Sequence, residues 1–362
     1  MKKLIRILGL ETSCDETSVA LLDVGVRGET VRLVKHVISS QIDIHAKYGG
    51  VVPEVAARTH VAEVVSLLTS VLGRRPLEAK GRATAFDAIA VTRGPGLATA
   101  LRVGIQAAQT LAWITGKPVI GVNHLEGHLA SAWLLPENRR RWTFPALALL
   151  VSGGHTELVV MRDYCRYDVI GSTRDDAAGE AFDKSAKLLG LGYPGGPVIS
   201  RFALKGRDDA YKLPRPMLHD ASLDMSFSGL KTAIRREVEI GNREPFGFAQ
   251  GRLGTGNRSI NDLCASIEAA IVAVLVAKTI RAAKQTKAKT VLLVGGVSAN
   301  ARLREDLTRA VRRELPKVAM LKTPVKYATD NAAMIAAAGA WRLLRGETHD
   351  WKKLDAEPEL SL

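Results

Sequence analysis

One arrangement occurs twice in this chain: an apolar strand, a polar turn and a second apolar strand. Residues 4–22 hold the first copy, with the turn at 11–17, and residues 146–161 hold the second, with the turn at 152–156. Short apolar runs bounded by turn residues are typical of buried strands, so each copy predicts a β-hairpin with functional groups at its tip. Strands alternate with helical patterns after each hairpin. We therefore expect an α/β protein built from two similar lobes that face each other.

The boundary between the lobes is predicted near residue 140, where an arginine run is followed by a tryptophan and a proline. We expect an N-terminal lobe over residues 1–140 and a C-terminal lobe over residues 141–330. The final segment, 331–362, begins with a core helix and is expected to pack back on the first lobe. Residues 241–257 hold five glycines and one proline without an apolar period, which predicts a flexible surface insertion.

Composition and charge narrow the class of protein. Of the 362 residues, 46% are hydrophobic and 24% are charged, which excludes disordered, fibrous and collagen-like chains. The net charge is +14, from 51 basic and 37 acidic residues, and such a surplus makes nucleic acid the leading class of partner. Basic residues cluster at 139–141, 235–236, 284–289 and 302–313. A single basic run is more often a solvated helix face, so the sequence leaves open which cluster binds.

Several features predict a cytoplasmic protein without a membrane partner. The longest uninterrupted apolar stretch, 269–277, has nine residues, whereas about 20 are needed to span a bilayer. No signal-peptide pattern follows the two N-terminal lysines. The three cysteines, Cys14, Cys165 and Cys264, lie far apart, so neither a disulfide framework nor a cysteine zinc site is expected.

The sharpest local signal is the pair His124 and His128. Histidines at i and i+4 project from one face of a helix and can share a metal ion. A third ligand is needed, and Asp330, at the predicted start of the last helix, is the best candidate in the sequence. Two histidines and one carboxylate with open positions suit non-haem iron or zinc. The ordinary alternatives are core or surface histidines and an aspartate that caps a helix.

The position of Glu126 argues against a zinc protease. Zincins use H-E-x-x-H, in which the glutamate next to the first histidine acts as general base. Here the glutamate comes one residue later, about 200° around the helix from His124, and points away from the metal face. With Asn123 as N-cap, Glu126 is predicted to complete a capping box.

Glycine-rich turns at 152–154, 192–196 and 295–300 form a second group of candidate site residues. Missing Cβ atoms let backbone amides approach an oxyanion, and a helix N-terminus favours phosphate. The sequence contains no P-loop motif, and none of these turns matches G-x-G-x-x-G, so neither a P-loop nor a Rossmann site is supported. A nucleotide would therefore have to bind between the lobes.

Six motifs, taken together, resemble the TsaD family of bacterial tRNA N6-adenosine threonylcarbamoyltransferases. They follow the family's order over nearly the whole chain, and the glycine-rich segment 241–257 is the departure from its pattern. The resemblance implies the actin-like ATPase (ASKHA) fold, with two RNase-H-like lobes around a central cleft. The motifs are residues 11–17 (ETSCDET), 124–128 (HLEGH), 150–156 (LVSGGHT), 179–184 (GEAFDK), 226–231 (SFSGLK) and 295–300 (GGVSAN).

The resemblance also implies a reaction and its participants. The family moves the threonylcarbamoyl group from threonylcarbamoyl-adenylate to N6 of the adenosine just 3′ of the anticodon, in tRNAs that read ANN codons, and releases AMP. Similar proteins bind one divalent metal ion, for which Fe²⁺ is the first expectation and Zn²⁺ the alternative. They act with a degenerate paralogue subunit (TsaB-like) and a small P-loop ATPase (TsaE-like).

By motif match, the resemblance assigns roles to individual residues. His124, His128 and Asp330 would hold the metal, and Asp15 and Glu16 would face the reacting centre. Because the carbamoyl carbon of a mixed anhydride is already activated, no protein nucleophile is required, and Glu16 is expected to accept the amine proton as a general base. The residues expected to bind the adenylate are Leu150, Val151, Ser152, Gly153, Gly154, Asp183, Gly196 and Asn300.

Four other functions remain open on the residues alone: a metalloendopeptidase, a sugar or acetate kinase of the same superfamily, a small-molecule carbamoyltransferase and a non-catalytic scaffold. A kinase does not require the histidine pair. A small-molecule carbamoyltransferase usually carries extra domains, for which 362 residues leave no room. Intact metal and nucleotide motifs argue against a scaffold.

Overall fold

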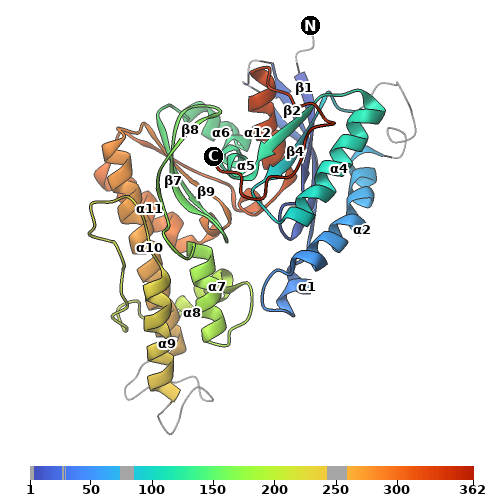
Figure 1. Cartoon of the computed structure of the whole chain (residues 1–362). Coiled ribbons are helices and arrows are strands. Elements are labelled where there is room, and N and C mark those ends of the chain that lie inside the picture. The colour runs from blue at the N-terminus through green and yellow to red at the C-terminus, as the bar shows by residue number, and fades with distance from the viewer. Residues whose placement is uncertain (1–3, 27, 29, 74–84, 243–258) are drawn as a thin grey trace. The chain divides into compact units, whose positions relative to one another are not determined.

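The computed structural model describes residues 4–26, 28, 30–73, 85–242 and 259–362 (Figure 1). These residues form two compact units, each with a five-stranded sheet and covering helices, so the expected α/β class is confirmed. Unit 1 is assembled from Met1–Trp142, Asp163–Tyr167 and Thr323–Leu362, and unit 2 from Thr143–Arg162 and Asp168–Lys322.

The sheet of unit 1 contains the first predicted hairpin. Its strand order is β3-β2-β1-β4-β5. The hairpin strands β1 and β2 are antiparallel, with Leu10 opposite Val19, and β3 pairs antiparallel with β2. Strands β4 and β5 extend the sheet in parallel to β1. The strands are β1 (Leu4–Glu11), β2 (Glu16–Gly25), β3 (Val31–Ser40), β4 (Ala88–Gly94) and β5 (Val119–Asn123).

Helices cover this sheet on both faces (Figure 1). Helices α2 (Pro53–Leu72) and α4 (Ala98–Thr115) pack on one face around a continuous apolar core. Helix α12 (Ala332–Leu344) packs on the other face, against β1. The approach is so close that a Cβ on Gly9 would lie 2.2 Å from the backbone oxygen of Ala332, which explains why glycine occupies this strand position.

The strand order in the sheet of unit 2 is β8-β7-β6-β9-β10. When the strands of each unit are counted along the chain, both orders run third, second, first, fourth, fifth, so the two sheets have the same strand order. Strands β6 and β7 form the second predicted hairpin, and β9 and β10 follow in parallel to β6. The repeated hairpin of the sequence therefore reflects one topology used twice, as expected of two RNase-H-like lobes. The strands are β6 (Ala146–Val151), β7 (Thr156–Asp163), β8 (Arg166–Ser172), β9 (Thr290–Val294) and β10 (Ala319–Lys322).

Helix α10 (Ile260–Gln285) is the central core helix of unit 2. It begins with a capping box, in which Ser259 Oγ accepts the amide of Asp262 and the Asp262 carboxylate accepts the amide of Ser259. Residues 243–257 of the predicted insertion lie outside the described residues, and 241–242 end helix α9. The other helices of the unit are α7 (Ala178–Leu188), α8 (Gly195–Ala203), α9 (Ser228–Asn242) and α11 (Ala301–Glu314).

By length and composition alone, α2 and α10 could each cross a membrane. The sequence analysis considered only uninterrupted apolar stretches and therefore identified neither helix as long enough to cross a membrane. Glu268 and Lys278 divide the apolar residues of α10, and Arg58 and Glu63 divide those of α2. The apolar window of α10 is 83% buried inside the structure, as in the core helix of a globular unit. That of α2 is 33% buried, on the face that packs against the sheet.

Candidate active site

The candidate metal ligands come from two short segments of unit 1. Helix α5 (His124–Ser131) starts directly after β5, and the side chain of Asn123 caps it by accepting the Leu125 amide at 2.8 Å. This cap fixes the first turn, so that His124 and His128 project from the same side. Asp330 lies just before α12, whose N-cap is Asn331 rather than Asp330. The carboxylate of Asp330 is therefore available for another role.

The structure brings His124, His128 and Asp330 together. One potential ligand atom from each lies within 4.8 Å of the others, and Asp330 Oδ1 is 3.4 Å from Nε2 of His124 and 3.3 Å from Nε2 of His128. Two ligand atoms that are each about 2.1 Å from an ion lie roughly 3–3.4 Å apart at octahedral or tetrahedral angles. These distances fit a shared metal ion.

The hydrogen bonding of His128 supports this interpretation. The side chain is fully buried, and neither ring nitrogen makes a hydrogen bond of normal geometry to any described residue. An imidazole left in this way loses the solvation of a polar group, which is costly unless another partner satisfies it. A metal ion bound at Nε2, opposite the Asp330 carboxylate, would supply that partner, and two histidines with one carboxylate are a common donor set for Fe²⁺ and Zn²⁺.

Glu11 is a further member of the site to which the sequence assigned no role. Its Oε2 atom lies 3.2 Å from Nδ1 of His124, and it also accepts a hydrogen bond from the Thr92 hydroxyl at 2.8 Å. The other oxygen accepts the amide of Ser13 at 2.6 Å. A carboxylate on the second ring nitrogen orients a ligating histidine and leaves Nε2 to face the ion. In the sequence, the position of Glu11 at the end of β1 was the signal from which its place in the site could have been predicted.

The buried charged groups of the site shift one another's pKa values. Burial opposes ionisation of His124, but Asp330 and Glu11 raise its pKa well above the ordinary value. Burial lowers the pKa of His128. Burial also acts against the Asp330 carboxylate, but the two histidines hold its pKa far below the ordinary value. One imidazole thus favours the charged form and the other favours the neutral form that a metal requires.

Asp15 and Glu16 lie at the tip of the β1–β2 hairpin, where the sequence predicts them. Both are nearly buried, with 9% and 7% of their surfaces exposed. Burial raises the pKa of Glu16 well above its ordinary value, with further increases from the Asp330 and Asp15 charges. Glu16 therefore holds a proton at a higher pH than an exposed glutamate would.

Two buried histidines, His45 and His60, hold this hairpin tip in place through hydrogen bonds. The sequence analysis did not predict this contact. His60 lies on α2, with Nε2 3.0 Å from the Cys14 carbonyl oxygen and Nδ1 2.8 Å from the Thr17 hydroxyl. Gln41 connects His60 to His45, which is also fully buried. The chain from His45 to Cys14 fixes the backbone that carries Asp15 and Glu16.

The predicted capping box at Glu126 is wrong. The Asn123 cap exists, but Glu126 makes its hydrogen bonds elsewhere: it accepts the Tyr167 hydroxyl at 2.7 Å and pairs with Nε of Arg342 at 2.6 Å. Its side chain is fully buried. Both partners are distant in sequence, so local helix rules could not identify them. Glu126 links α5 to α12 and to the segment Asp163–Tyr167, and it points away from the metal ligands as expected.

In unit 2, the glycine turns meet at the ends of the strands. Leu150 and Val151 are buried, whereas Gly153 and Gly154 are exposed after β6. A Cβ on Gly295 would lie 2.3 Å from the Val151 carbonyl oxygen, and this glycine has φ +91°, a conformation that other residues rarely adopt. The end of β6 and the turn after β9 are therefore packed backbone to backbone.

Asp183 and Gly196 lie on the neighbouring helices α7 and α8 of unit 2. Asp183 Oδ1 accepts the amide of Gly195 at 2.7 Å, so this carboxylate connects α7 to the first turn of α8. A Cβ on Gly196 would contact only Phe182, at 4.0 Å, so open space lies beside the N-terminus of α8. Exposed amides at a helix start are suited to bind phosphate.

Asn300 already has partners within the protein. Its Oδ1 atom caps α11 by accepting the Leu303 amide at 2.8 Å, and its Nδ2 atom donates to Ser200 Oγ at 2.9 Å and to Glu268 Oε1 at 2.7 Å. This side chain therefore positions the 295–300 turn. Within the predicted adenylate set, Gly153 and Gly154 offer exposed backbone, whereas the side chains of Asp183 and Asn300 hold neighbouring turns in place.

The fold and the donor set define a class of protein: an α/β chain of duplicated RNase-H-like topology, with a His-His-carboxylate group in unit 1 and glycine turns in unit 2. The family described as "TsaD: tRNA N6-adenosine threonylcarbamoyltransferase" matches residues 32–337. The chain belongs to the TsaD family.

Curated relatives agree with this assignment. A tRNA N6-adenosine threonylcarbamoyltransferase of Bordetella pertussis (strain Tohama I) is 50% identical over 340 residues, which cover 94% of this chain and 92% of the relative. The enzyme of that name from Desulfitobacterium hafniense (strain Y51) is 47% identical over 358 residues, which cover 99% and 98%.

Two solved structures share the fold. Full-length HypF in its phosphate- and nucleotide-bound form matches with a TM-score of 0.55 and 13% identity, over 95% of this chain and 47% of HypF. HypF from T. kodakarensis matches with a TM-score of 0.56 and 14% identity, over 94% of this chain and 48% of that one. This chain spans about half the length of these HypF chains, and the similarity shows the fold alone.

Proposed function

We propose that this protein transfers the threonylcarbamoyl group from threonylcarbamoyl-adenylate to N6 of the adenosine just 3′ of the anticodon in tRNAs that read ANN codons. The observation that carries the proposal is the conjunction of family membership over residues 32–337 with an intact His124–His128–Asp330 group. The adenosine amine attacks the carbamoyl carbon, the bond from that carbon to the phosphate oxygen breaks, and AMP leaves.

The residues of unit 1 supply positioning and proton transfer. His124, His128 and Asp330 would hold a divalent ion, for which Fe²⁺ is the first expectation and Zn²⁺ the alternative. The ion would act as a Lewis acid on substrate oxygen atoms. Glu16 accepts the proton that the amine loses, for which its raised pKa is suited. Burial is the main cause of this raised pKa, and the charges of Asp330 and of the neighbouring Asp15 add to it. The buried network through His60 holds both carboxylates in place.

The adenylate is proposed to bind the glycine turns of unit 2. The amides of the exposed Gly153 and Gly154 and of the half-buried Gly196 approach the phosphate, while Leu150, Val151 and Ser152 supply the strand end from which the turn emerges. Asp183 and Asn300 keep the neighbouring turns in register through their bonds to Gly195 and Leu303. Backbone donors held by a rigid sheet stabilise developing charge without reorganisation.

We further propose that the protein works in the cytoplasm with a degenerate paralogue subunit (TsaB-like) and a small P-loop ATPase (TsaE-like). The support is the family resemblance of the motifs. A protease is not favoured, because Glu126, the only glutamate within the histidine motif, is buried in an ion pair with Arg342 and cannot reach a substrate.

The decisive experiment is mass analysis of tRNA nucleosides from cells depleted of this protein, and of the purified chain with its partners, tRNA and threonylcarbamoyl-adenylate. We expect loss of threonylcarbamoyladenosine in the depleted cells. With the purified proteins we expect one AMP released for each modified adenosine. Unchanged modification after depletion, together with metal-dependent peptide cleavage, would refute the proposal.

A further inference from the structure

Much of the positive charge of this chain gathers around one helix, α11. Two hollows lie beside the helix, one of about 500 Å³ next to α10 and one of about 830 Å³ next to the end of β10. Nine different arginines and lysines line them, against three carboxylates. The surplus of six positive charges is a large share of the +14 of the whole chain.

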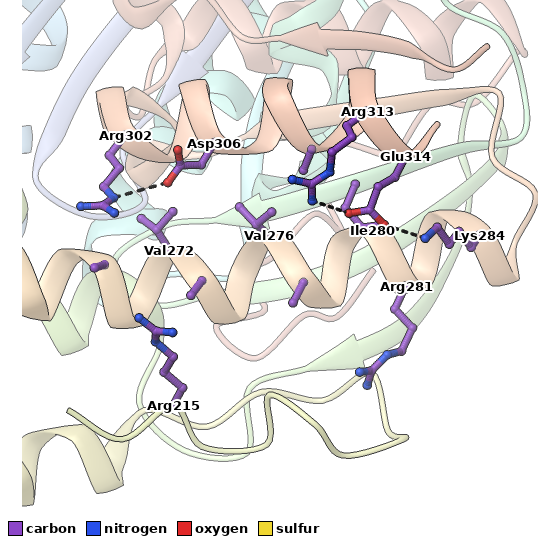
Figure 2. A pocket seen from close by; sticks show the side chains of 14 residues that line it. Arg215, Val272, Val276, Ile280, Arg281, Lys284, Arg302, Asp306, Arg313 and Glu314 are labelled. Carbon is purple, nitrogen blue, oxygen red and sulfur yellow. Dashed lines mark hydrogen bonds and ion pairs between the residues drawn. The ribbon is translucent and has the colours of Figure 1, made fainter. Parts of the chain in front are cut away.

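The first hollow lies between α11, α10 and the loop that precedes α9 (Figure 2). Its two carboxylates are already engaged with arginines and a lysine of the same hollow: Asp306 pairs with Arg302 at 3.3 Å, and Glu314 pairs with both Lys284 at 2.6 Å and Arg313 at 2.8 Å. Arg215 reaches toward α10 from the loop and is exposed to solvent. The net charge of this hollow remains positive after every ion pair has been counted.

The second hollow is more strongly basic. It is lined by four arginines and Lys322, with Glu305 as its one carboxylate, and Glu305 pairs with Arg309 at 2.5 Å. Arg304 donates to the Ser298 carbonyl oxygen at 3.0 Å, and Lys322 donates to the Thr308 hydroxyl at 3.2 Å.

The cations around Lys322 repel one another. Burial lowers the pKa of Lys322, and the charges of Arg304 and Arg312 lower it further. Several like charges held around one hollow destabilise the protein unless an anion binds among them.

From this arrangement we infer that the two flanks of α11 bind the phosphate backbone of the tRNA substrate. The inference rests on the proposed function for the identity of the polyanion. Residues 302–313 extend over about 16 Å of helix, which is long enough to contact several phosphates of a polynucleotide backbone. Arginines and lysines on both sides of such a ridge contact phosphates, which position the substrate without reading its sequence.

The apolar residues of this region disfavour a lipid surface or an apolar peptide. On α11 the leucines and the valine, Leu303, Leu307 and Val311, are buried. At the floor of the first hollow, Val272 is 2% exposed and Ile280 is 5% exposed. A membrane-binding helix would present apolar side chains beside its cations, whereas on α11 they are withdrawn from the surface. Val276 of α10 is half-buried in the first hollow, and arginines and a lysine surround it.

The test uses two variants with the same change of net charge. The first is R215E/R312E, which replaces one exposed arginine on each side of α11, and the control is R235E/R236E, which replaces two exposed arginines of α9. Binding of an unmodified tRNA transcript to the full-length chain with its partner proteins is measured between 50 and 300 mM salt. Melting temperature is measured for each protein.

We expect R215E/R312E to raise the dissociation constant for tRNA at least tenfold at 100 mM salt. The slope of log K against log salt should fall by roughly 1.4–1.8 for two lost phosphate contacts. KM for tRNA should rise with kcat and melting temperature nearly unchanged. The R235E/R236E control should bind tRNA within about twofold of the wild type, and R215K/R312K should retain most of the binding because lysine keeps the charge.

Equal losses in both charge-reversed variants would mean that net charge alone acts, and would overturn the inference. Wild-type binding by R215E/R312E would overturn it as well. Binding of anionic vesicles by the wild type, lost in R215E/R312E while tRNA binding persists, would assign the surface to lipid. Failure of the proposed function is distinguishable, because the wild-type chain would then form no modified adenosine at any tRNA concentration.

Discussion

The two sheets share one strand order, yet their hairpin tips are built by different means. The tip of β1–β2 is charged and internally fixed: Glu11, His60 and Thr17 hold it through buried side-chain hydrogen bonds. The tip of β6–β7 is exposed backbone, and a Cβ on Gly153 or Gly154 would meet no atom within 4 Å. One topology therefore supports side-chain chemistry in unit 1 and backbone recognition in unit 2. Substitutions should affect the two tips in different ways.

The largest effect is expected from His128→Ala in unit 1. It removes a buried nitrogen that faces Asp330 at 3.3 Å. We expect loss of bound metal and a fall of at least about a hundredfold in tRNA modification, since a ligand matters more than the outer-shell partners, whose loss costs 10–100-fold. Elemental analysis and single-turnover assays measure both. The exposed His219 provides the control, and its alanine variant should keep metal and activity; metal retained at the wild-type level in His128→Ala would contradict the assignment.

The second prediction separates the metal ligands from the scaffold beneath them. Glu126→Ala leaves the half-buried Arg342 with only the exposed Glu347 as its carboxylate partner, and it removes the acceptor of the Tyr167 hydroxyl. We therefore expect a loss of about 1–3 kcal/mol in the free energy of unfolding. Metal should still bind to the folded fraction. Glu347→Ala removes the exposed partner of the same arginine and should cost no more than about 1 kcal/mol. Equal destabilisation by the two variants in denaturant titrations would show that the buried pair is not the main contact.

The third prediction concerns the exposed glycine backbone at the hairpin tip of unit 2. Gly153→Ala adds a methyl group in open space, so folding should be unaffected. If backbone amides approach the phosphate there, KM for threonylcarbamoyl-adenylate should rise about tenfold, equivalent to about 1.4 kcal/mol. Gly295→Ala is the matched structural change, because it forces a Cβ against the Val151 carbonyl at positive φ, and it should lower the melting temperature. Wild-type KM in Gly153→Ala would remove the turn from the adenylate site.

The smallest expected effect is the pH dependence of stability that one ion pair in each sheet contributes. Asp23 is buried and pairs with Arg6 and Arg32, and these partners lower its pKa below the ordinary value. Its contribution, about 1 kcal/mol, is present above the unfolded-state pKa near 4 and is lost as the pH falls through the folded-state value. Asp23→Asn should therefore destabilise the protein more at pH 7 than at pH 2.

The exposed pair Arg162–Asp168 in unit 2 is the control for this pH effect. Asp168→Asn should change stability little at either pH, because exposed pairs contribute 0–1 kcal/mol. Urea titrations at the two pH values measure both variants. A larger effect of Asp168→Asn than of Asp23→Asn at pH 7 would contradict the burial argument.

Local patterns predicted much of the fold and part of the site. The hairpins follow from apolar runs and turn residues, and the i, i+4 spacing of His124 and His128 placed both on one side of α5. Asp330 could be named as the third candidate because one carboxylate stood at the start of a predicted helix. All three predictions depend on neighbours within a few residues or on a single helix start.

Predictions failed where the partner lies far along the chain. Glu126 meets Tyr167 and Arg342, which are 41 and 216 residues away. Glu11 reaches His124 across 113 residues. Capping rules describe the free energy of one helix end, and a buried charge instead takes the partner that tertiary packing brings to it. The sequence shows the acidic side chain but not the cation that neutralises it.

The position of α12 in the chain determines when the first unit can be finished during synthesis. Asp330 and α12 follow more than 300 other residues, although they complete a sheet that starts at Leu4. Until they leave the ribosome, one face of β1 remains uncovered and the histidine pair lacks its carboxylate. A nascent or prematurely terminated chain thus exposes an apolar surface that chaperones and proteases recognise. Asp330 accordingly joins the candidate metal ligands late in the synthesis of this protein.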